Sequence, residues 1–362
     1  MEGHVGELVV GGFPGASLPA PFAKALRERR RGGAILFKPN VEGGPCQVAA
    51  LTRELHAATA SASASSPARH TLVGVDQEGG RVARLRAPLL VVPPMRAVAS
   101  WGDEALAERI ARAVAAELAA LGVTIDFAPV LDVNTCPHNP VIGDRAFGED
   151  PETCARFGAA WIRGLQSAGI LACGKHFPGH GDTSKDSHFD LPVVDQPRER
   201  LERVELAPFR AAVAAGVATL MTAHVVYPAL DPDRPATMSP ASSTELRDAL
   251  GFDGVLFSDD LEMQAIAARM TVEEAAVRAI AAGCDALLVC WSDEKQERAV
   301  DALAREADRS PAFAARCAQA LRRVNAARQR VTARPADEAA VAQAIGGPES
   351  RAVAAEMARR AG

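Results

Sequence analysis

The sequence has little net charge and few aromatic side chains. Its 362 residues hold 45 acidic and 40 basic side chains, a formal charge of −5. Such a small charge argues against a nucleic-acid or polybasic membrane partner. The basic run at 27–31 does not change this, because cations favour the last turn of a helix. Only 4% of residues are aromatic while 48% are hydrophobic, and alanine is very abundant, which indicates a helix-rich globular protein packed with small side chains.

Paired cysteines and long apolar runs are also missing. The seven cysteines include no C-x-x-C pair, and several, such as Cys173 and Cys290, lie in apolar segments. They are expected to behave as small buried hydrophobes in a reducing compartment. The segment 1–13 has no basic start and only a short apolar run. We therefore expect neither a signal peptide nor a membrane span, and a cytoplasmic location.

Short apolar runs alternate with amphipathic stretches along the chain. Continuously apolar strands separated by helices are typical of a parallel sheet buried on both faces. The runs that we expect to be strands are 8–13, 33–37, 71–75, 123–127, 170–173, 219–223, 254–258 and 286–290. The helices expected between them are 20–30, 46–60, 103–121, 151–168, 199–215, 242–250 and 272–282. Seven or eight such units over about 290 residues favour an α/β fold of the closed (β/α)8 barrel (TIM-type) kind.

The expected division of the chain is simple. Residues 1–331 form one barrel domain, and 332–362 form a helical tail whose last helix begins near Pro348. A dinucleotide-binding fold has no support, since no G-x-G-x-x-G follows an early strand.

One segment concentrates the titratable side chains. Residues 175–188 hold three histidines, two lysines and two aspartates directly after the apolar run 170–173. Pro178, Gly179 and Gly181 exclude a regular helix, so a loop leaving the end of a strand is expected. Such a loop on a rigid scaffold is typical of an active site, although a solvated surface loop is the plainer alternative.

Polar residues also follow several other expected strands. Because the catalytic groups of a barrel come from the carboxyl ends of its strands, these residues should gather on one face. They are Asp76, Asp132, Arg145, Lys175, His176, Asp186, His188, His224, Asp259 and Asp260.

Two of these groups suggest acid/base or nucleophilic chemistry. Strand alternation directs Asp259 and Asp260 to opposite sides, so only one should face the barrel mouth; Asp260 could instead cap the next helix. In Asp186-Ser187-His188 the i, i+2 spacing lets the carboxylate orient the imidazole, as a general acid/base requires. The alternative for this triplet is a turn with a solvated histidine.

A metal site is the competing interpretation of the loop. His-x3-His binds zinc well on a helix, but Pro178 and Gly179 separate His176 from His180, and Lys175 would repel the ion. We therefore expect no metal. The candidate ligands are His176, His180, Asp182, Asp186 and His188.

Long motifs in this order resemble the β-N-acetylglucosaminidases of glycoside hydrolase family 3, the NagZ type. The resemblance extends over nearly the whole chain. It rests on Gly33-Ala34-Ile35-Leu36-Phe37, Asp76-Gln77-Glu78-Gly79-Gly80-Arg81-Val82-Ala83-Arg84, Ala128-Pro129-Val130-Leu131-Asp132-Val133-Asn134, Gly143-Asp144-Arg145-Ala146-Phe147-Gly148, the segment 175–188 and Ser258-Asp259-Asp260-Leu261-Glu262-Met263.

The resemblance implies roles for single residues. Asp259 would be the nucleophile and His188 the acid/base, with Asp186 as its partner. The positions that would bind the hydroxyls of N-acetylglucosamine are Asp76, Arg84, Arg145, Lys175 and His176, and those that would support them are Asp132, His180 and His224. It further implies a retaining, metal-free and cofactor-free enzyme that removes N-acetylglucosamine from anhydro-muropeptides during cell-wall recycling, or from chito-oligosaccharides.

Other readings stay open from the sequence. A histidine acid/base is neutral after donating its proton and would not repel phosphate, so a phosphorylase is an alternative, as is another sugar preference. From another class, the chain could be a metal-dependent barrel hydrolase or an inactive sugar-binding barrel. We expect a monomer with a small carbohydrate substrate, and an acid/base loop, 176–188, that moves during turnover. The tail 348–356 is similar to the linker that precedes a second α/β domain in longer relatives.

Overall fold

Eight parallel strands close into a barrel in the computed structural model, which describes residues 4–60, 70–184 and 191–361. Around the barrel the order is β1-β12-β11-β8-β7-β6-β3-β2. The strands are β1 (Val9–Gly11), β2 (Gly33–Leu36), β3 (Leu72–Val75), β6 (Ile125–Asp126), β7 (Leu171–Phe177), β8 (Thr219–Thr222), β11 (Val255–Asp260) and β12 (Ala286–Val289). Within the described residues these are the eight expected runs, so the TIM-type barrel is confirmed.

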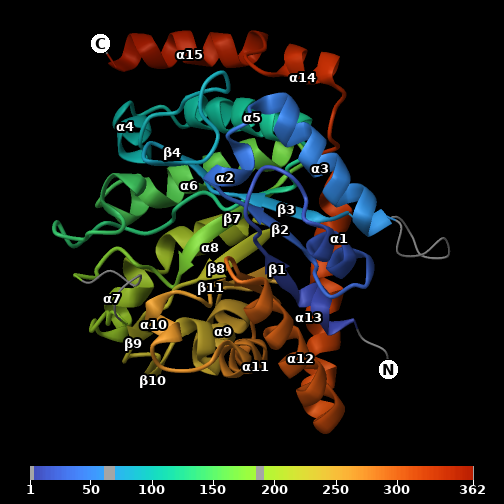
Figure 1. Ribbon diagram of the computed structural model, residues 1–362. Helices are drawn as coiled ribbons and strands as arrows, with labels where there is room; N and C mark the ends of the chain where they lie inside the picture. Colours follow the sequence, from blue (N-terminus) through green and yellow to red (C-terminus); the bar gives the residue numbers. More distant parts are fainter. Residues whose placement is uncertain (1–3, 61–69, 185–190, 362) are drawn as a thin grey trace.

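Helices form a layer around the outside of the barrel (Figure 1). They are α1 (Ala20–Arg27), α2 (Lys38–Val41), α3 (Pro45–Ala60), α4 (Met95–Ser100), α5 (Glu104–Ala120), α6 (Pro151–Ser167), α7 (Arg198–Arg203), α8 (Ala207–Ala214), α9 (Pro240–Thr244), α10 (Gln264–Ala267), α11 (Val272–Ala282), α12 (Asp293–Arg309) and α13 (Pro311–Arg330). Two short antiparallel pairs, β4 (Gln77–Gly79) with β5 (Val82–Ala83) and β9 (Val226–Tyr227) with β10 (Asp231–Pro235), extend from barrel strands.

Local sequence signals explain where long helices begin. Asp150 precedes Pro151, and its carboxylate accepts a hydrogen bond from the Thr153 amide at 2.8 Å. Ser310 and Pro311 begin α13 in the same way. A capping oxygen satisfies an otherwise unpaired amide, and proline is preorganised for the first turn.

The inside of the barrel is filled by apolar side chains. Phe127 and Phe257 meet edge to face, with ring centroids 5.5 Å apart. A Cβ at Gly74 would lie only 2.5 Å from the Phe127 ring, so this strand position requires glycine. The barrel is therefore a packed core, and ligands must bind at its ends.

Several expected boundaries differ from the structure. β7 continues to Phe177, so Lys175 and His176 belong to the strand and the loop begins at Pro178. The helix expected at 199–215 is divided into α7 and α8, and the one at 242–250 continues past α9 as a single π-helical turn. The charged residues of β7 resemble a loop in sequence because their ion-pair partners are distant along the chain.

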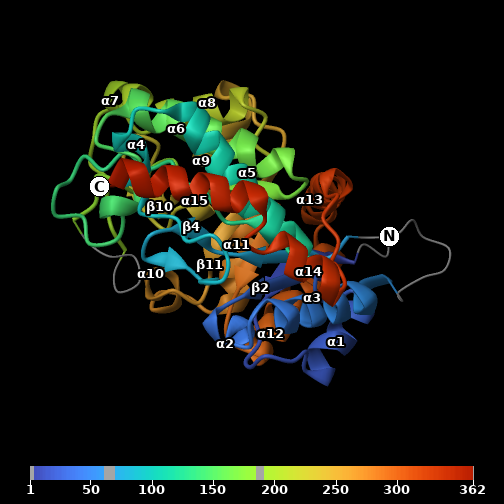
Figure 2. The ribbon, with the colours of Figure 1, turned by 90° about the horizontal axis from the view of Figure 1, so that it is seen from above.

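The tail folds back onto the barrel helices. It forms α14 (Glu338–Ala344) and α15 (Pro348–Ala361), and the helix start at Pro348 is confirmed. In both views α15 lies over α5 (Figures 1 and 2). The buried Glu117 of α5 accepts hydrogen bonds from the Gly346 amide at 2.9 Å and the Ser350 hydroxyl at 2.7 Å. The division at 331/332 stays a prediction. None of the helices in the described part of the chain is both long and apolar enough to span a membrane.

Candidate active site

A cavity of about 400 Å³ opens at the carboxyl ends of the barrel strands. It falls in the range of small-ligand pockets. All five predicted sugar-binding residues and the predicted nucleophile line it: Asp76, Arg84, Arg145, Lys175, His176 and Asp259. The barrel thus brings together side chains that are up to 183 positions apart, from Asp76 to Asp259.

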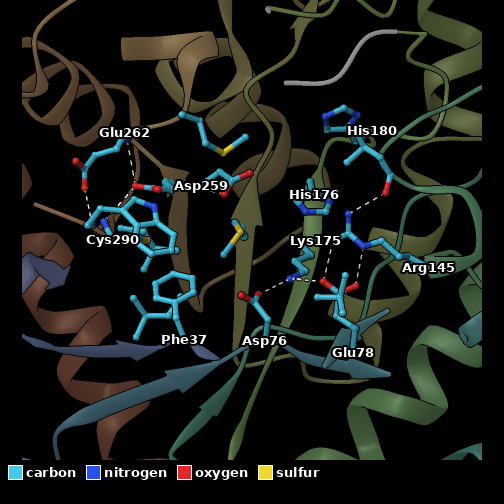
Figure 3. A pocket seen from close by; sticks show the side chains of 18 of the residues that line it. Phe37, Asp76, Glu78, Arg145, Lys175, His176, His180, Asp259, Glu262 and Cys290 are labelled. Atoms are coloured by element: carbon cyan, nitrogen blue, oxygen red, sulfur yellow. Dashed lines mark hydrogen bonds and ion pairs between the residues drawn. The ribbon is translucent and has the colours of Figure 1, made fainter. Parts of the chain in front are cut away.

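Ion pairs connect the charged residues on one side of the cavity (Figure 3). The Lys175 ammonium lies 2.9 Å from the Asp76 carboxylate and 2.6 Å from that of Glu78. Arg145 donates two hydrogen bonds of 2.8 Å to Glu78, a bidentate pair. Arg84 donates to the second oxygen of Asp76 at 2.9 Å. Each cation is therefore held in a fixed direction by a carboxylate.

The same pairs keep these groups ionised. Burial alone would raise the pKa of the Asp76 carboxyl, but the charges of Lys175 and Arg84 lower it well below its ordinary range. For Glu78, burial is likewise outweighed by Arg145 and Lys175, which lower its pKa to about 2. The two carboxylates in turn raise the pKa of Lys175 despite its burial. At neutral pH the cluster holds fixed charges that can donate to and accept from sugar hydroxyls.

Glu78 is a functional candidate that sequence reasoning missed. It lies within the motif that runs from Asp76 to Arg84, and the family resemblance implies no role for it. Asp76 and Glu78 are two positions apart, and in an extended segment such residues project to the same side. That spacing was the available signal.

Asp259 reaches the cavity from β11 and is partly exposed there. One of its oxygens accepts the Asp260 amide at 2.8 Å. Burial would raise the pKa of this carboxyl, but the neighbouring His224 and His176 together lower it. An ionised carboxylate at the cavity wall is a competent nucleophile.

Asp260 lines the same cavity, so the expectation that only one of the two would face it is wrong. The register between β11 and β12 shifts between Phe257 and Asp260, which breaks the regular alternation of side chains. One oxygen of Asp260 accepts the amides of Glu262 at 3.1 Å and Cys290 at 3.2 Å. Burial raises the pKa of Asp260 to about 7. Asp260 thereby holds the chain after β11 to the chain after β12.

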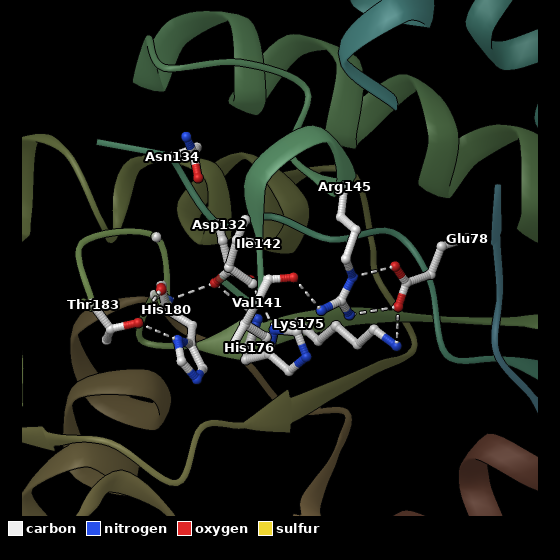
Figure 4. Close-up of polar contacts among 12 residues, drawn as sticks. Glu78, Asp132, Asn134, Val141, Ile142, Arg145, Lys175, His176, His180 and Thr183 are labelled. Carbon is white, nitrogen blue, oxygen red and sulfur yellow. Dashed lines mark hydrogen bonds and ion pairs between the residues drawn. The ribbon is translucent and has the colours of Figure 1, made fainter. Parts of the chain in front are cut away.

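Asp132 organises the beginning of the loop after β7 (Figure 4). Its carboxylate lies 2.7 Å from Nδ1 of His176 and accepts the backbone amide of His180 at 2.6 Å. The cationic form of His176 lowers the pKa of Asp132 although burial opposes this. Asp132 does not line the cavity, which agrees with a supporting role.

The two other supporting histidines also have protein partners. His180 Nδ1 lies 2.9 Å from the Thr183 hydroxyl, and burial lowers its pKa to about 4, so it is neutral at pH 7. His224 contacts the Thr237 hydroxyl at 2.7 Å and the Asp260 carbonyl at 3.0 Å. Of the two, only His180 lines the cavity.

The predicted acid/base pair, Asp186 and His188, lies outside the described residues. Their roles, and the motion expected of their loop, stay predictions.

Metal ligation was the competing interpretation of this loop. Among residues 4–60, 70–184 and 191–361, no group of three or more histidine, cysteine or acidic side chains is placed to hold a metal ion. The candidate ligand Asp182 accepts hydrogen bonds from Thr135 at 2.6 Å and Gln196 at 2.7 Å. Its oxygens therefore serve the loop structure.

Comparison with known proteins agrees with this geometry. A sequence model of the Glycosyl hydrolase family 3 N terminal domain matches residues 4–327. A β-hexosaminidase of Pseudomonas aeruginosa (strain LESB58) is 44% identical over 296 residues, which are 80% of this chain and 84% of that protein.

Two solved structures are similar over nearly the whole chain. The first is a glycoside hydrolase family 3 β-N-acetylglucosaminidase from Paenibacillus sp. str. FPU-7, with a TM-score of 0.90 and 41% identity, covering 99% of this chain and 68% of that one. The second is NagZ from Neisseria gonorrhoeae in complex with N-trifluoroacetyl-D-glucosamine, with a TM-score of 0.78, 31% identity and 98% coverage of both chains.

Proposed function

The chain belongs to glycosyl hydrolase family 3 and is a glycoside hydrolase of the β-N-acetylhexosaminidase type, and we propose that it cleaves terminal β-linked N-acetylglucosamine with retention of configuration. Its substrates on this proposal are cell-wall anhydro-muropeptides or chito-oligosaccharides. The location that fits muropeptide recycling is the cytoplasm.

The observation that supports this proposal most is the arrangement of charges around Asp259. An ionised carboxylate shares a cavity of about 400 Å³ with the ion-paired Lys175 and Arg145. A single pyranose fits this volume, and the charged donors and acceptors match its hydroxyls. The fixed cluster binds and orients the ring, and Asp259 supplies the nucleophile.

In the proposed mechanism Asp259 attacks the anomeric carbon as the bond to the leaving oxygen breaks. His188, oriented by Asp186, gives its proton to that oxygen and becomes neutral. The glycosyl-enzyme ester is then hydrolysed by water, whose proton returns to His188. Two inversions leave the product in the β configuration. Support for the roles of His188 and Asp186 comes from the sequence motif.

The test compares the wild type with Asp259→Ala and His188→Ala on nitrophenyl β-N-acetylglucosaminide in the presence of EDTA. We expect Asp259→Ala to lose several orders of magnitude in kcat, because no nucleophile remains. His188→Ala should lose less on this activated substrate, since general acid help is worth about 10²–10⁴-fold on ordinary leaving groups. The matched control is Asp233→Ala, which removes an exposed carboxylate outside the cavity.

Three further readouts separate the alternatives. Proton NMR of the first product should show the β anomer, and a 5-fluoro-N-acetylglucosaminyl fluoride should add one glycosyl unit to the mass of the wild type but not of Asp259→Ala. Formation of a sugar phosphate in phosphate buffer would indicate a phosphorylase instead. Loss of activity in EDTA, or full activity of Asp259→Ala, would contradict the proposal.

A further inference from the structure

Trp291 is an exposed aromatic residue at the edge of the catalytic cavity. It is 61% exposed, and the described residues contain only two other large apolar side chains classed as exposed, Val91 and Val193. Trp291 lines the cavity, whereas neither valine does. Water contact on an indole ring is unfavourable, so an exposed tryptophan at a binding cavity indicates a ligand surface.

The indole is held in place rather than free to rotate. Its ring stacks on that of Phe37, with centroids 4.4 Å apart and planes 24° from parallel. The guanidinium carbon of Arg84 lies 5.6 Å from the Phe37 centroid, which supports Phe37 in turn. Since Phe37 covers one face of the indole, the exposed surface of Trp291 is the rest of the ring, which includes the other face.

The backbone at Trp291 is held by Glu262, which lies two positions after the end of β11. The Glu262 carboxylate accepts the amides of Trp291 at 2.6 Å and Ser292 at 3.2 Å. Its other oxygen lies 3.1 Å from the Lys295 ammonium. Glu262 follows Asp259 by three positions, so the aromatic surface and the nucleophile are connected through one short segment. We call the Phe37–Trp291 pair the aromatic platform.

The aromatic platform is on a different side of the cavity from the Glu78–Arg145 ion pair. Figure 3 shows Phe37 and Cys290, the neighbour of Trp291, across the cavity from Glu78 and Arg145, with Lys175 and Asp76 between them. The charged side suits the hydroxyls of the sugar that is removed. The exposed platform suits a ring that extends outward from the cavity.

We propose that the aromatic platform binds the leaving-group sugar, the pyranose that lies beyond the bond to be cleaved. The C–H groups on one face of a pyranose carry partial positive charge, and they would pack on the electron-rich indole face. The proposal rests on the glycosidase function above, and it adds the two residues, Phe37 and Trp291, that form the contact surface for a leaving-group sugar.

The test compares two substrates that carry the same N-acetylglucosaminyl group. One is β-linked N,N′-diacetylchitobiose, whose leaving group is a pyranose, and the other is β-N-acetylglucosaminyl fluoride, whose leaving group is a single atom. For Trp291→Ala we expect kcat/KM on the disaccharide to fall about tenfold, mainly through KM, because loss of an aromatic contact is worth about that factor. On the fluoride it should change less than twofold.

Matched variants complete the design. Trp291→Phe retains a ring and should recover most of the disaccharide activity. Val91→Ala removes another exposed apolar side chain, 53% exposed and outside the cavity, and should alter neither rate. Equal losses on both substrates would mean that Trp291 acts on the removed sugar or on folding. No loss on either substrate would mean that Trp291 does not contact the leaving-group sugar. Each of these results would overturn the proposed role of the aromatic platform. An inactive wild type would instead refute the glycosidase function.

A binding measurement gives an independent readout. Of the three tryptophans in the chain, Trp161 is fully buried and Trp291 is highly exposed. In the slow Asp259→Asn variant, the disaccharide should shift the fluorescence emission to shorter wavelength as it covers Trp291. The shift should disappear when Trp291→Phe is added. A shift that persists in the double variant contradicts the proposal.

Discussion

Replacing Glu78 by glutamine tests whether the charged cluster works as a unit. Glu78 is 1% exposed and holds both Arg145 and Lys175. The substitution keeps the shape of the side chain but removes its charge and directs an amide donor toward two cations. Lys175 keeps Asp76, and Arg145 keeps the Val141 carbonyl at 3.1 Å.

Two estimates of the stability loss agree. The cluster lowers the pKa of Glu78 from its ordinary 4.5 to about 2, and at 1.36 kcal/mol per unit this corresponds to about 3 kcal/mol. Breaking a buried ion pair typically costs about 3–5 kcal/mol. With an unfolding entropy of about 2.1 cal/mol/K per residue over 362 residues, a loss of about 3 kcal/mol lowers Tm by about 4 °C.

The effect should depend on pH in a defined direction. A carboxyl whose pKa is lowered by folding stabilises the protein fully above its unfolded pKa and loses that contribution as the pH falls toward its folded pKa. The stability difference between wild type and Glu78→Gln should therefore be constant near neutrality and decrease by about 1 kcal/mol between pH 7 and pH 3.5.

The assay is denaturant and thermal unfolding at several pH values, together with kcat/KM at pH 7. Activity should fall between about tenfold and a hundredfold, because Arg145 loses its orientation. The control is Glu149→Gln, which removes an exposed partner of Arg96 and should cost less than about 1 kcal/mol. A loss below about 1 kcal/mol for Glu78→Gln, or a difference that does not change with pH, would refute the reasoning.

Three further substitutions test other buried carboxylates. Asp132→Asn should lower kcat/KM at least about tenfold with folding retained by circular dichroism, because His176 loses its charged partner; unchanged kinetics would contradict this. Glu117→Ala should destabilise the protein by about 2–3 kcal/mol and make 345–361 sensitive to proteolysis, since the Ser350 hydroxyl and two amides lose their acceptor; a protected tail would show that other contacts suffice. Asp285→Asn, at the opposite end of β12 from the cavity, should lower the free energy of unfolding by about 3–5 kcal/mol and leave KM unchanged, and a change in KM would count against a purely structural role.

Much of the fold could be predicted from local patterns. Each barrel strand is a continuous apolar run because both of its faces are buried, and this pattern is visible without knowing the strand's neighbours. Helix starts at Pro151 and Pro348 follow from proline chemistry within a few residues. Predicted element boundaries were wrong where a residue's ion-pair partners are distant in the sequence. Lys175 is an example, because its charge is compensated by Asp76 and Glu78.

The sequence by itself therefore determined the barrel, the family resemblance and most of the charged and histidine side chains at the cavity. The apolar runs placed Asp76 and Asp259 at strand ends, and parallel strands bring such ends to one face. These inferences succeed because strand periodicity and motif spacing are local properties.

Tertiary structure decided which groups touch. Only the closed barrel places Arg145 against Glu78, brings Asp260 to the cavity through a register shift, and stacks Trp291 on Phe37. Phe37 and Trp291 are 254 positions apart in the sequence, and no local pattern pairs them. Such contacts depend on barrel closure and on packing between distant segments. These determine which charged groups pair and which aromatic rings stack, and hence the chemistry of the site.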